Sequence, residues 1–128
     1  MKGYVTNIEK ETKDNSDFRR VLYTAPNSQL VLMTLKPREE IGMEIHKLDQ
    51  FFRFEAGEGK VIIDGEENLV KGGFAVVVPA GSQHNIMAIT ELKLYTIYSP
   101  AHHKDGVVRA TKAEAEADSP EFDGVTTE

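Results

Sequence analysis

Four polar side chains in two short segments have the types and the spacing of a metal site. Glu44 and His46 lie two residues apart, Gln50 follows them, and His84 lies in a second segment. Two imidazoles and one carboxylate suit divalent transition metals such as Fe, Mn, Ni, Co or Zn, and a glutamine adds a neutral amide oxygen. Such a cation polarises an oxygen of a small molecule or supports dioxygen chemistry, depending on the metal. The sequence therefore predicts a divalent metal centre at these four residues and identifies no catalytic residue beside them.

Strand geometry gives these side chains a reason to converge. Successive side chains on a strand alternate between its two faces, so Glu44 and His46 share a face if their segment is extended. Gln50 has the same parity as Phe52 and Phe54 in the segment that follows. Polar groups on an apolar inner wall are costly unless they are given a partner. A bound cation would be that partner.

The elements that position the site are expected to be short strands. Apolar or alternating runs recur along the chain, and glycine, proline or Asp-Gly turns separate them. We expect strands over residues 21–24, 30–35, 43–46, 50–55, 60–63, 68–70, 74–78, 84–89 and 92–98. This pattern predicts an all-β sandwich or closed barrel in one domain, residues 1–128, with a core of about residues 20–100. A capping box at Thr111–Glu114 predicts a short helix within residues 110–128, and no helix is expected before residue 110.

The two segments resemble the two sequence motifs of the cupin superfamily. The matching positions are Gly42, Glu44, His46, Gln50 and Gly57 in the first motif, and Gly73, Pro79, Gly81 and His84 in the second. Glu44 stands where a first histidine is usual, Gln50 where a glutamate is usual, and Ala88 where an asparagine is usual. The resemblance covers roughly residues 20–110 and is nearest to the single-domain cupins labelled mannose-6-phosphate isomerase-like.

This resemblance implies a double-stranded β-helix, or jelly roll, with a short C-terminal helix. It also implies a homodimer, which cupins often form with N-terminal residues such as 3–8 here. The expected function is that of a metal-dependent enzyme acting on a small polar, sugar-like substrate, with isomerase-type chemistry. A dioxygenase-type cupin and a small-molecule binding module without turnover are the alternatives. No cluster of arginine and lysine suited to a phosphate group lies near the motifs.

Each candidate residue also has a plainer interpretation. His46 alone is a barrel histidine with its hydrogen bonds satisfied, and His84 alone is a loop histidine beside a turn. Gln50 can hydrogen-bond to Glu44 or His46 instead of binding the cation. Glu44 faces solvent if its strand is bulged. Only the two motifs together favour the metal centre.

Two further groups of residues near the second motif remain open. Tyr95 and Tyr98 are expected to pack in the core or at an edge, with one hydroxyl in the pocket as the alternative. His102 and His103 are neighbours, and adjacent residues of an extended chain face opposite ways, so both cannot easily bind one ion. We expect them in a surface loop that folds over the barrel mouth.

Composition restricts the partners. The net charge of −6 argues against nucleic acids and anionic membranes as partners. The chain contains no cysteine, which excludes disulfides and thiolate metal sites. No apolar run approaches 18 residues and no signal peptide is visible at the N-terminus, so a cytoplasmic protein is expected.

Overall fold

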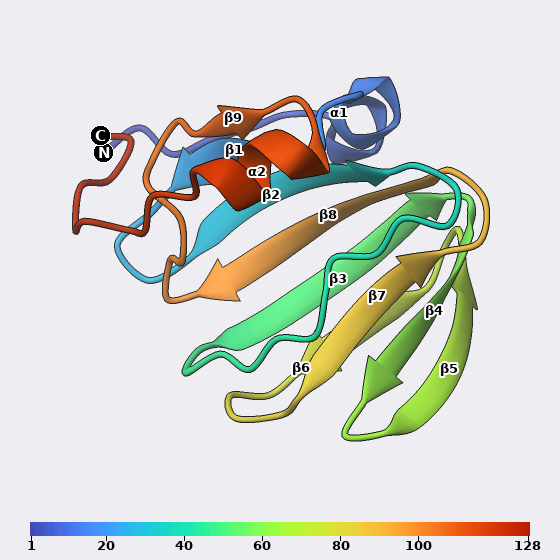
Figure 1. Ribbon diagram of the computed structural model, residues 1–128. Coiled ribbons are helices and arrows are strands. Elements are labelled where there is room, and N and C mark those ends of the chain that lie inside the picture. Colours follow the sequence, from blue (N-terminus) through green and yellow to red (C-terminus); the bar gives the residue numbers. More distant parts are fainter.

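Two antiparallel sheets face each other and enclose the core (Figure 1). The structure is a computed structural model that describes residues 1–128. The strands are β1 (Arg19–Thr24), β2 (Gln29–Leu35), β3 (Asp49–Ala56), β4 (Glu58–Ile63), β5 (Glu66–Lys71), β6 (Ala75–Val78), β7 (His84–Ala88), β8 (Leu92–Ser99) and β9 (Val108–Arg109). The larger sheet has the order β6-β3-β8-β2-β1-β9, and the smaller has the order β5-β4-β7. The predicted all-β jelly-roll architecture with a short C-terminal helix is confirmed.

Every expected strand is present except the one over residues 43–46. There the chain runs beside β7 and bonds to it irregularly: the amides of Arg38, Ile41 and Glu44 donate to carbonyls of β7. These donors lie three residues apart, whereas a strand bonded to one neighbour donates from every second residue. Glu44 therefore forms only an isolated bridge with His84. The alternation of faces nevertheless holds, because Ile45 is exposed between two partly buried ligand candidates.

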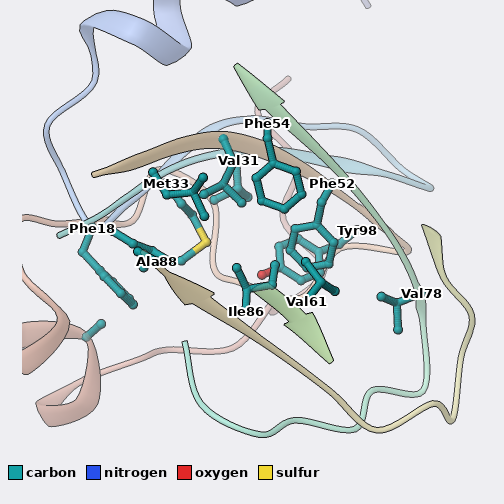
Figure 2. Close-up of a cluster of buried hydrophobic side chains, with 14 of the residues drawn as sticks. Phe18, Val31, Met33, Phe52, Phe54, Val61, Val78, Ile86, Ala88 and Tyr98 are labelled. Carbon is teal, nitrogen blue, oxygen red and sulfur yellow. The ribbon is translucent and has the colours of Figure 1, made fainter. Parts of the chain in front are cut away.

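The core lies between the two sheets, and the side chains of β3 that point into it include a candidate ligand. Phe52 and Phe54 of β3 are fully buried and lie opposite Val61 and Ile86 of the smaller sheet (Figure 2). Gln50 continues the inward row of β3 toward the end of the sheet, where it pairs with Tyr98 of β8. The row therefore changes from apolar to polar at one end of the barrel.

Two helices flank the sheets, and one of them contradicts the expectation of no helix before residue 110. Helix α1 (Ile8–Asp14) has seven residues, and only Thr12 among them is buried. It therefore has no apolar stripe for a periodicity argument to detect. Asn7 caps the helix by accepting a hydrogen bond from the amide of Lys10. Ion pairs between side chains four residues apart on the exposed face also stabilise the helix.

The predicted C-terminal helix is α2 (Lys112–Ala117). The hydroxyl of Thr111 accepts a hydrogen bond from the amide of Glu114, as the capping box requires. The Glu114 carboxylate accepts from the amide of Ala110, one residue earlier than in the standard box. Neither helix is long and apolar enough to cross a membrane.

Candidate metal centre

Glu44, His46 and His84 bring one ligand atom each to a single point. These carboxylate and imidazole atoms all lie within 4.8 Å of one another. Backbone pairing accounts for the convergence, because Glu44 and His84 exchange both amide hydrogen bonds and the amide of Gly81 donates to the carbonyl of His46. The turn of the second motif thus holds the first motif directly. Three of the four predicted ligands meet in this way.

The carboxylate of Glu44 is held as an anion. Burial raises the pKa of Glu44, whereas the hydrogen bond and the charge of His46 lower it. Together the lowering effects are larger, so the pKa of Glu44 ends below its usual value. Glu44 Oε2 lies 2.6 Å from His46 Nε2. The centroids of the His46 and His84 rings are 5.4 Å apart. One negative oxygen and two imidazole nitrogens are donors that suit a divalent transition metal.

Gln50, the fourth predicted ligand, lies in the same pocket and has an oxygen without a partner. The side chain is 3% exposed, and its amide nitrogen donates to Thr96 Oγ1 at 3.0 Å. It bonds neither Glu44 nor His46. Gln50 Oε1 is buried and accepts no hydrogen bond, which is costly for a carbonyl oxygen. A cation in the pocket that Gln50 shares with Glu44 and His84 would satisfy this oxygen, so the residues present fit a metal ion.

The remaining two histidines also lie at this end of the barrel. The ring of His102 is 4.4 Å from that of His46, between centroids, and 5.3 Å from the ring of Tyr98. His103 Nε2 lies 3.3 Å from the Tyr98 hydroxyl. The loop was expected at the surface, over the barrel mouth; His102 does lie over the mouth, but His103 is 5% exposed and is part of the wall.

Gln29 holds this loop against the barrel through hydrogen bonds of its side chain. Its side-chain oxygen accepts hydrogen bonds from the amides of His102 and His103, at 3.2 and 3.0 Å. Its nitrogen donates to the carbonyl of His103 at 2.7 Å and to Thr24 Oγ1 at 3.0 Å. The sequence offers no indication of this role, because a glutamine at the start of an apolar strand looks like a solvent-exposed end residue. Only the distant loop gives it partners.

Burial shifts the pKa values of the aromatic groups around the mouth. Burial raises the pKa of Tyr98 far above its usual range, so its hydroxyl keeps its proton. Burial also lowers the pKa of His102, and the charges of His46 and Arg19 act in the same direction. His102 is therefore a neutral base near pH 7. Of the two tyrosines left open by the sequence, Tyr98 is the one whose hydroxyl faces the pocket.

We expect His103 to make the protein less stable in acid. Burial, followed by the charge of Arg19, lowers the pKa of His103 to about 2. In the unfolded chain an ordinary histidine takes up a proton below about pH 6.5, while the native state stays neutral. The unfolded state then binds the additional proton, and this group alone should remove about 2 kcal/mol of unfolding free energy between pH 7 and pH 5.

Urea unfolding of the wild type and of His103→Gln at both pH values measures this contribution. The variant should lose less stability than the wild type as the pH falls, because a neutral amide has nothing to titrate. Parallel losses in the two proteins would show that His103 is not the group responsible.

Comparisons with known proteins agree with this architecture. The sequence model of the family described as "Cupin domain" matches residues 31–98. The chain is 44% identical to "Uncharacterized protein YrkC" of Bacillus subtilis (strain 168), over 91% of this chain and 67% of that protein. It is 43% identical to "Uncharacterized protein L612" of Acanthamoeba polyphaga mimivirus, over 82% of this chain and 70% of that protein. The crystal structure of BH2720 from Bacillus halodurans has a TM-score of 0.89 and 42% identity, over 91% of this chain and 96% of that one. The chain therefore belongs to the cupin family.

Proposed function

We propose that the protein is a metal-dependent enzyme that acts on a small polar molecule at the mouth of the barrel. One observation supports this most strongly: ligand atoms of Glu44, His46 and His84 lie within 4.8 Å of one another, beside the unsatisfied oxygen of Gln50. These four residues would hold a divalent transition metal, one of Fe, Mn, Ni, Co or Zn. Bound there, the cation would act as a Lewis acid toward an oxygen of the substrate.

We propose isomerase-type chemistry, in which a proton leaves one carbon and returns to its neighbour. His102 is the residue that we assign to this transfer, because it lines the cavity next to Glu44 and its lowered pKa keeps the imidazole neutral and able to accept a proton. The Tyr98 hydroxyl would donate a hydrogen bond to the substrate without giving up its proton, because burial raises its pKa. Together they would place one base and one hydrogen-bond donor beside the metal ligands.

A dioxygenase is the second candidate, and the ligand set favours it specifically. Two histidines and one carboxylate are the donors of the non-haem iron oxygenases. Turnover of candidate substrates by iron-loaded protein, with and without oxygen, separates the two activities. Product that forms without oxygen supports the isomerase and excludes the dioxygenase, while strictly oxygen-dependent product does the reverse.

Metal analysis of the purified protein tests the basis that both candidates share. Mass spectrometry of the elements should find close to one divalent ion per chain, either as purified or after reconstitution and removal of excess metal. A protein that holds no metal after reconstitution would contradict both enzymatic functions. A small-molecule binding module without turnover would then be the remaining candidate function.

A homodimer in the cytoplasm remains our expectation for the assembled protein. The exposed apolar side chains of Leu69, Phe74 and Ile89 line one hollow of the surface, which suits burial against a second copy. Analytical ultracentrifugation at micromolar concentration should therefore find twice the mass of the chain. A single monomeric species would contradict it.

A further inference from the structure

A buried arginine faces the cavity next to the candidate metal centre. Arg19 of β1 is only 7% exposed, and it lines a cavity of about 230 Å³ together with Glu44, Tyr98, His102 and His103. The cavity therefore has the guanidinium among its walls and a candidate metal ligand, Glu44, among them as well. A molecule that occupies it would meet both.

The guanidinium has almost no partner within the protein. Of its donors, only Nη1 makes a hydrogen bond, to Ser119 Oγ at 3.1 Å, and Nε is buried with none. No carboxylate lies within ion-pair distance of it, although the carboxylates of Glu44 and Glu121 line the same cavity. The guanidinium carbon also lies 5.3 Å from the centroid of the Phe18 ring. An unpaired charge removed from water is costly, so an anion in the cavity would stabilise the protein.

The neighbouring carboxylates form no ion pair with the guanidinium, although the charge of Arg19 contributes to lowering the pKa of Glu44. Glu44 is already engaged with His46 at 2.6 Å and is a ligand in the proposed centre. Glu121 belongs to the C-terminal tail and is exposed, and its backbone forms a bridge with His103. With a divalent cation on Glu44, His46 and His84, the cavity would be net positive. Its charge then suits a small anion with a single negative group toward Arg19.

We propose that Arg19 binds a carboxylate group of the substrate. The other end of the substrate would then reach the metal centre. The substrate class is thus a small carboxylic acid, and this rests on the proposed function for its second point of attachment. A guanidinium matches a carboxylate with two parallel N–H donors. The cavity has the volume of about seven or eight waters, which suits an acid of a few carbons. A phosphate dianion is less suitable, because the cavity offers it one arginine and two carboxylates.

Titration calorimetry with acids and their neutral amides tests the assignment. Metal-loaded protein is titrated with malonate, succinate and malate, and with the corresponding diamides, which have nearly the same shape but no charge. The wild type should bind at least one acid about 10- to 100-fold more tightly than its diamide. Arg19→Gln should lower this ratio about 10-fold, because only the attraction of the cation for the second carboxylate remains, and it should leave the metal content unchanged. Arg20→Gln, on the exposed side of the same strand, should keep the wild-type ratio.

Arg19→Lys is a second variant for the case in which Arg19→Gln does not fold. It keeps the charge without the paired donors, so it should retain a preference for acids with weaker binding than the wild type. The wild-type comparison of acid and diamide also stands alone. Equal binding of both, or no binding of any acid, overturns the assignment, as does an unchanged ratio in Arg19→Gln. Tighter binding of glycerol 3-phosphate than of every acid also overturns it.

The two proposals fail in different ways. A protein that holds metal but does not distinguish acids from diamides keeps the metal centre and loses the carboxylate site. A protein that holds no metal but prefers acids through Arg19 loses the proposed enzymatic function and keeps the carboxylate site.

Discussion

His84→Ala should leave the protein without its metal ion. His84 supplies one of the three ligand atoms that lie within 4.8 Å of one another, and no other histidine replaces it from β7. Loss of a residue that merely supports a ligand commonly costs 10- to 100-fold in metal affinity, so loss of the ligand itself should cost at least about 100-fold. Elemental analysis after dialysis against metal-free buffer should find close to one ion per chain in the wild type and almost none in the variant.

Gln83→Ala is the matched control for this experiment. Gln83 precedes His84 in the chain and its side chain is exposed, so the variant should retain the wild-type metal content. Circular dichroism spectra of the two variants should agree with that of the wild type, because neither change removes a buried apolar group. Full metal content in His84→Ala would show that the cation binds elsewhere.

Gly57→Ala should be among the most destabilising single substitutions in the chain. Gly57 has a φ of +93°, and a Cβ there would lie 2.0 Å from the backbone oxygen of Glu91. The variant must both adopt an unfavourable backbone conformation and displace a neighbouring chain segment. We expect the free energy of unfolding, measured by urea denaturation, to fall by about 3 to 5 kcal/mol.

Gly73→Ala isolates the backbone part of this effect. Gly73 has nearly the same φ, +94°, but a Cβ there would meet no atom within 4 Å. We expect a loss of only about 1 to 2 kcal/mol. Equal losses in the two variants would mean that the close approach of Glu91 costs nothing, contrary to the packing. Gly57 is thus required by both its backbone conformation and the close approach of Glu91, whereas Gly73 is required by its backbone conformation alone.

The fold and the convergence of Glu44, His46 and His84 could be predicted because their evidence is local in the sequence. The parity of Gln50, Phe52 and Phe54, and the two-residue spacing of Glu44 and His46, hold in the structure even though one expected strand is absent. That strand is missing because its hydrogen-bond partner, β7, meets it out of register, which no property of residues 43–46 reveals.

The rest of the site depends on contacts between distant parts of the chain. Arg19 and Gln29 become significant only when Ser119 and the His102–His103 loop are placed beside them, 100 and about 73 residues away. Helix α1 could not be predicted for a related reason. Its cap and its charge pairs stabilise it, and it has no apolar face that a periodicity argument could detect. Burial of polar side chains by remote segments cannot be derived from periodicity.

The exchange of amide hydrogen bonds between Glu44 and His84 has a consequence for how the barrel opens. The same two residues provide ligand atoms and join an irregular segment to the edge of β7. Separation of that edge would therefore also separate the ligands, and a cation bound there would oppose local unfolding of this end of the barrel. Metal binding and local order at the mouth would thus stabilise each other: a weaker bridge would lower the affinity for the ion, and a bound ion would favour the closed bridge.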